Sequence, residues 1–415
     1  MTEKPNSMRE TPPLPNPPER LGLDDLPCLC RPLTVLGALA LSGGLVMNTF
    51  FGPEGHFVHA YLYNYGFFLS ITLGGLFFVA IQHVTRAGWS VTVRRLAEVF
   101  GANVPVMAIL FLPIVAAVFN AMPLYPWSQP EIVAEQPLLQ HKAVYLNPTF
   151  FTLRAVFYFA VWGWLGRYFL RRSLEQDQSK DPGLTRRMER LSPAALVLLG
   201  GTVTFASFDW LMSLEPEWFS TIFGLYYFAG AMVGFLAVVI LAAMLLQATG
   251  RATVSITVEH YHDLGKLLFG FVIFWGYMAF SQYMLIWYAN IPEETQWYLT
   301  RQTGSWAGVS LVLLFGHLLI PFFGLLPRAA KRRKAILGFW AVWLLATHWL
   351  DLYWLVMPSM AGVEGGCLPL GLVDVLCFVG IGSLYLAGAI RLATAGALVP
   401  QGDPRLAESL AFENM

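Results

Sequence analysis

Acidic and histidine residues inside long apolar stretches have the clearest capacity for chemistry in this sequence. Asp209 and His317 each lie within such a stretch, and His348 precedes Asp351 by three residues in another. A charge in hydrocarbon is unfavourable, so ionisable residues there mark proton or substrate sites by default. A histidine and an aspartate three residues apart share one helix face and can exchange a proton. We predict a proton path through these four residues; the alternative is that they only join helices by hydrogen bonds.

A second ionisable group opens another apolar stretch. It consists of Glu259, His262, Asp263 and Lys266. Their spacing of three and four residues places them on one side of a helix, so we interpret them as candidates for the mouth of the same proton path. The alternative is structural, because acids are favoured at a helix N-terminus and a lysine can extend its ammonium group to the membrane surface.

Aromatic residues near one end of the apolar stretches are candidates for a quinone site. A quinone needs flat apolar walls, a hydrogen-bond donor and a group that takes its protons. The candidates are Tyr226, Tyr227 and Trp287. The alternative is that they belong to the aromatic belt at the membrane interface.

The cysteines and histidines predict neither a metal site nor covalent haem. The four cysteines form no Cys-x-x-Cys or Cys-x-x-Cys-His pattern. His260 and His262 are two residues apart, a spacing that directs their rings to different sides of a helix. We therefore expect no metal and no covalently bound cofactor on this chain.

The composition requires lipid to cover most of the protein. Of 415 residues, 56% are hydrophobic and only 13% are charged, whereas water-exposed surfaces carry about 25–35% charged residues. Lysine and arginine together equal aspartate and glutamate in number, so the chain has no overall basic charge for nucleic acid. The composition therefore predicts a membrane protein that does not bind nucleic acid.

Ten apolar stretches approach or exceed the length of about 20 residues that crosses a bilayer as a helix. They are residues 33–51, 60–84, 98–120, 149–169, 193–213, 218–247, 263–288, 305–327, 336–357 and 370–395. We expect an all-α polytopic membrane protein with about ten transmembrane helices. A proline-rich tail at 1–32 and a C-terminal tail at 396–415 would flank a transmembrane domain at 33–395. Lysines and arginines gather in both tails and in alternate loops, which places both termini in the cytoplasm by the positive-inside rule.

Two stretches carry a similar pattern that predicts an internal duplication. Asp209 and Asp351 are each followed seven residues later by a proline, and each stretch follows a basic loop. Because the two aspartates are four spans apart, we expect two parallel four-helix bundles, at 60–213 and 218–357, with the first and tenth spans peripheral. The alternative is coincidence between two short matches.

Longer motifs resemble one family of membrane subunits. They are YNYGFF at 63–68, RAGWSV at 86–91, FDWLMSLEPEWFSTI at 208–222, HDLGKL at 262–267, AFSQYMLIWYANIPEET at 279–295 and DPRLAESL at 403–410. Together these motifs resemble the F-type membrane subunit of bacterial alternative complex III, a quinol:electron-acceptor oxidoreductase. That subunit is similar to NrfD-type or polysulfide-reductase-type membrane anchors.

The resemblance implies a place in a respiratory or photosynthetic complex in the bacterial inner membrane. The implied partners are a sister NrfD-like membrane subunit of the same fold, an iron–sulfur subunit and cytochrome c-type subunits. Haem and iron–sulfur clusters are then expected on those partners, and a quinone or menaquinone at the membrane subunits. This chain would conduct protons and contribute to quinone binding without carrying a redox centre. The alternatives are a structural and assembly role or a separate secondary transporter.

Overall fold

The computed structural model describes residues 21–23, 25–360 and 368–414, and this part of the chain is helical without a strand. The α-helices are α1 (Cys30–Phe51), α2 (His56–Val84), α3 (Val91–Gly101), α4 (Val104–Leu110), α5 (Leu112–Phe119), α6 (Pro130–Glu135), α7 (Pro137–Lys142), α8 (Pro148–Ser179), α9 (Pro182–Trp210), α10 (Phe223–Ala248), α11 (Val258–Ala289), α12 (Pro292–Gln302), α13 (Gly304–Val312), α14 (Ile320–Leu325), α15 (Arg328–Arg332), α16 (Lys334–Val356), α17 (Leu372–Ala393) and α18 (Leu406–Leu410). Short 3₁₀ segments are η1 (Pro27–Leu29), η2 (Gly88–Ser90), η3 (Pro126–Ser128), η4 (Met212–Leu214) and η6 (Met357–Ser359), and η5 (Leu313–Leu319) is a π-helix. Most of the tail predicted at 1–32 lies outside the described residues.

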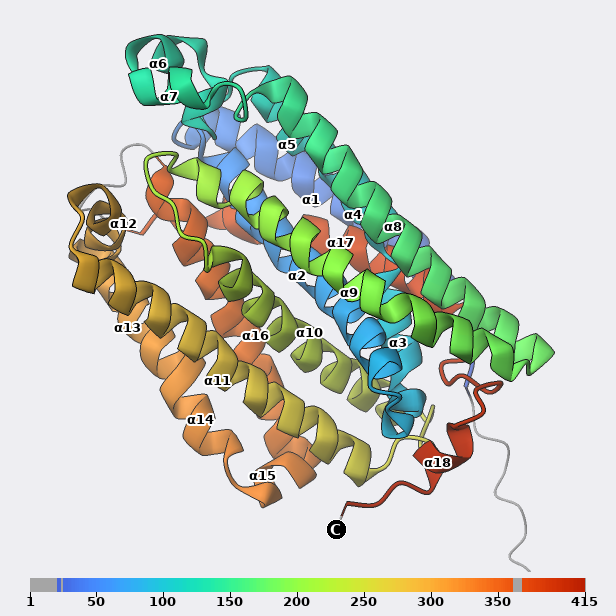
Figure 1. Ribbon diagram of the computed structural model, residues 1–415. Helices are drawn as coiled ribbons and strands as arrows, with labels where there is room; N and C mark the ends of the chain where they lie inside the picture. The colour runs from blue at the N-terminus through green and yellow to red at the C-terminus, as the bar shows by residue number, and fades with distance from the viewer. Residues whose placement is uncertain (1–20, 24, 361–367, 415) are drawn as a thin grey trace, which may run out of the picture.

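Nine helical segments of the described chain are long and apolar enough to cross a membrane, which confirms the all-α polytopic fold class. They are Pro27–Phe51, His56–Val84, Gly88–Phe119, Pro182–Leu214, Phe223–Ala248, Val258–Ala289, Gly304–Leu325, Lys334–Ser359 and Leu372–Ala393. The remaining predicted span, 149–169, lies in α8. This helix has 32 residues and packs along α9 (Figure 1). Arg154 within its apolar part lowers its hydropathy, so α8 is not among the nine.

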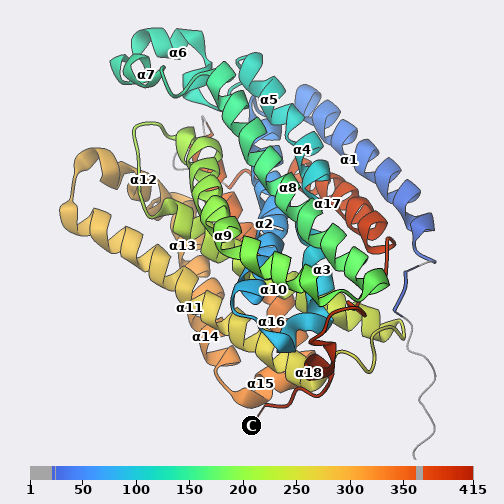
Figure 2. The same cartoon turned by 45° about the vertical axis from the view of Figure 1, so that its right-hand side comes forward.

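The helices run between two ends of the molecule. One end carries α6, α7 and α12, and we call it the α12 end (Figures 1 and 2). The other carries α15 and α18, and we call it the α18 end. The loops predicted to be cytoplasmic lie at the α18 end, because that end holds the connections from α2 to α3, from α8 to α9 and from α14 to α16.

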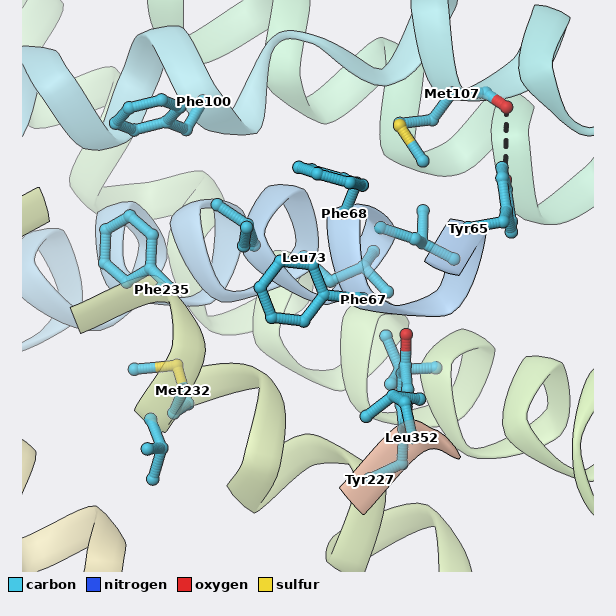
Figure 3. Close-up of a cluster of buried hydrophobic side chains, with 14 of the residues drawn as sticks. Tyr65, Phe67, Phe68, Leu73, Phe100, Met107, Tyr227, Met232, Phe235 and Leu352 are labelled. Atoms are coloured by element: carbon cyan, nitrogen blue, oxygen red, sulfur yellow. Dashed lines mark hydrogen bonds between the residues drawn. The ribbon is translucent and has the colours of Figure 1, made fainter. Parts of the chain in front are cut away.

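Two helices, α2 and α10, pack against each other at the centre and are the most buried of the nine segments. Close packing here depends on small residues: a Cβ atom at Gly74 of α2 would lie 2.4 Å from the Cβ atom of Phe235 on α10. Figure 3 shows the apolar side chains around this contact, among them Phe67, Met232 and Phe235. Around α2 lie α3 and α9, and around α10 lie α11 and α16. The internal duplication itself stays a prediction.

The helices α1 and α17 pack on each other through glycines beside α2. A Cβ atom at Gly37 of α1 would lie 2.6 Å from Leu384 Cγ, and one at Gly380 of α17 would lie 2.6 Å from Leu41 Cγ. Distances this short leave no room for a side chain, so these glycines allow the close approach that membrane helices use in place of hydrophobic burial.

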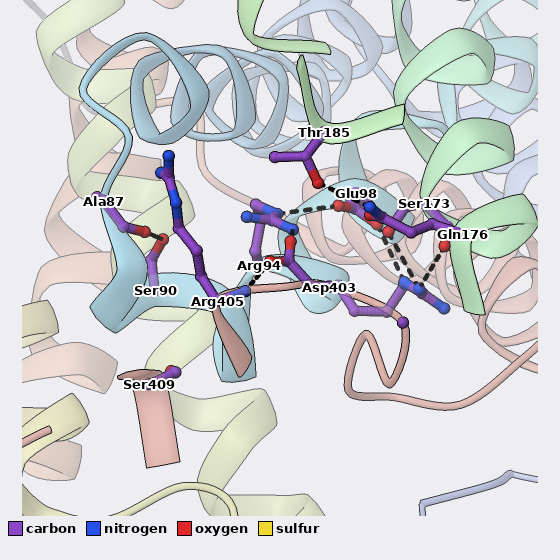
Figure 4. Close-up of polar contacts among 12 residues, drawn as sticks. Ala87, Ser90, Arg94, Glu98, Ser173, Gln176, Thr185, Asp403, Arg405 and Ser409 are labelled. Atoms are coloured by element: carbon purple, nitrogen blue, oxygen red, sulfur yellow. Dashed lines mark hydrogen bonds and ion pairs between the residues drawn. The ribbon is translucent and has the colours of Figure 1, made fainter. Parts of the chain in front are cut away.

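The C-terminal segment folds back over the α18 end. Asp403 forms an ion pair with buried Arg94 of α3 (Figure 4). Ser409 Oγ donates a hydrogen bond of 2.7 Å to the Trp89 carbonyl oxygen. Arg95 donates to Asp177 of α8 at 2.7 Å. This network holds the last residues against α3 and α8.

The contact between α1 and α17 makes a testable prediction. Gly37→Leu should lower the free energy of unfolding by about 1–3 kcal/mol, as overpacking does, and should release α1. The matched control is Gly43→Leu, because nothing lies within 4 Å of a Cβ atom at Gly43. The measurement is the thermal unfolding midpoint of the full chain in detergent. Equal midpoints for the two variants would contradict this account.

Candidate functional site

Asp351 of α16 is buried among neutral hydrogen-bond donors. Asp351 is only 1% exposed to solvent. The Tyr226 hydroxyl of α10 donates to Oδ1, and Trp275 Nε1 of α11 donates to Oδ2 at 3.2 Å. Within the described residues Asp351 forms no ion pair. A proton is therefore the cation available to this carboxyl group, which suits it to proton exchange.

His348 lies one turn before Asp351, in a space that two glycines leave open. Its Nε2 is 2.9 Å from Ser70 Oγ of α2, and Ser70 donates its own proton to the Phe67 carbonyl oxygen. Nε2 is therefore the donor, and Nδ1, which has no partner among the described residues, carries a free lone pair. A Cβ atom at Gly234 of α10 would lie 2.7 Å from the His348 ring.

His317 completes this group from η5. Its ring stacks on Trp275 with centroids 4.1 Å apart and lies 6.3 Å from the His348 ring. Neither of its nitrogens has a side-chain hydrogen-bond partner among the described residues, and the polar group nearest to the ring is the Thr347 backbone. A π-helix turn is frequent at functional sites, and here it places the histidine between α11 and α16. We call Asp351, His348, His317, Trp275, Tyr226 and Ser70 the Asp351 cluster.

A cavity of about 600 Å³ opens beside this cluster, between α11, α12, α13 and η5. Tyr226 and Trp275 form part of its wall, so the two donors to Asp351 also face the cavity. Most other lining residues are apolar or aromatic, including Tyr298 and Trp354. Its volume and lining match those of sites for flat, amphipathic molecules.

The three quinone candidates fall in different places. Only Tyr226 lines the cavity. Tyr227 donates its hydroxyl proton to the Gly66 carbonyl oxygen at 3.0 Å, which joins α10 to α2. Trp287 is 65% exposed and is not among the residues that line the cavity.

Asp209 of α9 is bound very differently from Asp351. Arg154 of α8 donates Nε to Oδ2 at 2.8 Å and Nη2 to Oδ1 at 3.0 Å, and Tyr158 donates to Oδ2 at 2.8 Å. The guanidinium group also stacks over the Tyr145 ring at 3.8 Å. A bidentate pair of this kind fixes the orientation of the carboxyl group and compensates its charge with two hydrogen bonds. The sequence analysis did not pair these residues, although Arg154 was a second charge inside a predicted span.

The group at the start of α11 lies at the α18 end and is not brought together with the Asp351 cluster. Asp263 pairs with Lys266, and Glu259 pairs with Arg332 of α15. His262 Nδ1 is 3.8 Å from Asp263. Twelve residues of helix, about 18 Å, separate Asp263 from Trp275. Between them, the buried side chains of α11 are Leu264, Leu268 and Val272.

The pair of Arg154 and Asp209 makes a testable prediction. Arg154→Met should destabilise the chain by about 3–5 kcal/mol, because it leaves a buried carboxylate without its cation. The double variant Arg154→Met/Asp209→Leu should recover most of this loss, since both charges are then removed. Unfolding of the purified chain in a denaturing detergent measures both. Equal losses in the single and double variants would contradict the ion-pair account.

Comparisons with known proteins identify no family for this chain, so its function is inferred from the geometry of the Asp351 cluster and its cavity. No protein-family model matches the chain, and no curated protein matches it. Membership of the alternative complex III family therefore stays a prediction from the sequence motifs.

Proposed function

We propose that this chain is the proton-exchanging membrane subunit of a quinol oxidoreductase of the alternative complex III type. The observation that carries the proposal is the double role of Tyr226 and Trp275. Both residues line the 600 Å³ cavity, and both donate hydrogen bonds to Asp351. A quinol ring in the cavity would therefore be separated from a buried proton acceptor by one layer of side chains.

The chemistry of quinol oxidation matches these groups. Quinol releases two protons and two electrons as it becomes quinone. The protons need acceptors, and the cluster provides the Asp351 carboxylate and the free Nδ1 of His348. Both groups lie near one point: a Cβ atom at Gly230 would be 3.2 Å from His348 Nδ1 and 3.7 Å from Asp351 Oδ2. The electrons would leave through redox centres on the partner subunits that the family resemblance implies.

The first bundle takes a structural role in this proposal. Asp209 is held in an ion pair and a hydrogen bond, whereas Asp351 receives neutral donors only. The purely structural alternative thus applies to the part of the molecule around Asp209, and the proposal assigns proton exchange to the part around Asp351.

Quinone binding can be tested with two neighbouring tyrosines. The Tyr226 hydroxyl proton goes to Asp351, so its oxygen can only accept a hydrogen bond, and a quinol hydroxyl in the cavity could donate one. Tyr226→Phe should therefore weaken binding of a short-chain menaquinol by roughly 2- to 12-fold, the value of one hydrogen bond. Tyr227→Phe removes the same group from a residue that contacts Gly66 and should leave binding unchanged. Quenching of tryptophan fluorescence in the full chain, in detergent, gives the dissociation constants. Equal constants for the two variants would overturn the placement of the quinone.

Proton exchange can be tested in the native complex. Asp351→Asn keeps the size of the side chain and removes its titration, so quinol turnover should fall about 100-fold or more, as when a general base is lost. Haem content per complex should stay at the level of the unchanged protein. Full turnover in an assembled Asp351→Asn complex would refute proton exchange, and loss of haem together with the subunit would support the structural alternative instead.

A further inference from the structure

A second cavity, of about 550 Å³, lies at the α18 end between α2, α9 and the C-terminal segment. Four arginines and one glutamate line it, an excess of three positive charges. The charged residues are Arg86, Arg186, Arg190, Arg405 and Glu189. From this geometry we infer that the cavity binds the phosphate group of an anionic membrane phospholipid. The site is independent of the proposed quinone chemistry and depends only on the membrane character of the fold.

Two of the four arginines share one carboxylate, and the other two have no ion-pair partner among the described residues. Glu189 lies 3.5 Å from Arg86 and 2.9 Å from Arg405, so it balances those two. Arg186 and Arg190 form no ion pair within the described residues. They are four residues apart and therefore lie on one face of α9. Like charges at this spacing destabilise a helix. An anion between them would remove the repulsion, and a phosphate accepts arginine donors especially well.

A buried histidine lies in the wall of the cavity. His83, at the end of α2, lines the cavity and is only 2% exposed. Its Nε2 has no hydrogen-bond partner among the described residues. Nε2 is itself buried behind the cavity wall, so the histidine contributes to the shape of the wall.

The position of the cavity favours a lipid over free phosphate. With 29 residues, α9 is about 44 Å long, which exceeds the hydrocarbon thickness of about 30 Å. Its first turns, with Arg186 and Arg190, therefore reach headgroup level. Basic pockets between membrane helices at the cytoplasmic surface are typical sites for anionic lipid headgroups.

An apolar stripe continues from the arginines along the same face of α9. Pro193 lines the cavity, and Val197, one turn further, is 77% exposed. Nothing lies within 4 Å of a Cβ atom at Gly201, and Phe205 is exposed beyond it. The charged end of the helix would bind the phosphate of the headgroup, and the open apolar stripe beyond it would contact the acyl chain.

The C-terminal segment keeps Arg405 in the wall of the cavity. Figure 4 shows Arg405 beside Asp403, which pairs with Arg94, and the Thr185 side chain of α9 nearby. Arg405 N donates to Asp403 Oδ1 at 2.8 Å. Because Arg94 is itself buried and paired with Glu98, the segment is anchored to α3 next to Arg405, and the ion pair of Arg405 with Glu189 ties it to α9.

Native mass spectrometry of the full chain, titrated with phosphatidylglycerol, tests this site. The variant Arg186→Gln/Arg190→Gln should weaken the tightest lipid binding about 25-fold, because each basic residue near an anionic headgroup is worth about fivefold. The matched control is Arg167→Gln/Arg187→Gln, which removes the same charge from exposed positions that do not line the cavity. It should leave the tightest binding within about twofold of the unchanged chain. Equal weakening in both double variants would overturn the site.

Two further measurements keep the inference falsifiable. Glu189→Gln releases Arg86 and Arg405 from their shared carboxylate and should strengthen phosphatidylglycerol binding, an effect that a merely structural glutamate would not produce. Phosphatidylcholine should not compete for the site, because it carries no net negative charge. Inorganic phosphate should not displace the lipid at equal concentration. Displacement by phosphate at that concentration would show a free-anion site and overturn the lipid assignment.

Discussion

A carboxyl group buried among membrane helices must obtain its hydrogen bonds from the protein, because lipid offers none. The chain meets this requirement in two ways. At α9, Arg154 compensates Asp209 with a full positive charge, and at α16, Tyr226 and Trp275 give Asp351 hydrogen bonds without a charge. The two carboxyl groups occupy similar sequence patterns, yet only the first is paired with a charged partner among the described residues.

The same requirement shapes the α12 end, where Arg301 is completely buried. Burial lowers the pKa of Arg301, and Glu215 opposes this effect with an ion pair of 2.8 Å. Its remaining donors reach the carbonyl oxygens of Trp354 and Leu355 at the end of α16. Arg301 thus fixes Trp354, which lines the cavity beside Asp351. The position of the cavity wall therefore depends on a buried charge outside the membrane-spanning segments.

The sequence was sufficient to predict the helices but not the contacts between them. Apolar stretches of about 20 residues have few alternatives to a helix in lipid, so every predicted span falls on helical structure. Two of them are interrupted: 98–120 is divided among α3, α4 and α5, and 305–327 among α13, η5 and α14. The partner of Asp209 could have been suspected from Arg154, a charge in span 149–169. The partners of Asp351 could not, because nothing in the sequence relates Tyr226 in one span, or Trp275 in the middle of another, to this carboxyl group. The π-helix at η5, which orients His317, likewise has no simple sequence signal.

The polar contacts beyond the Asp351 cluster lie toward the α12 end. Trp349 donates to Asn64 Oδ1 at 2.8 Å, and Asn64 Nδ2 donates to the Asp374 carbonyl oxygen at 3.3 Å. The Asp374 side chain then meets His56 Nε2 at 3.0 Å, at the start of α2. In the opposite direction, the buried side chains of α11 before Trp275 are apolar as far as Asp263. The buried polar side chains of α2 and α17 therefore gather toward the α12 end, the side away from the basic loops.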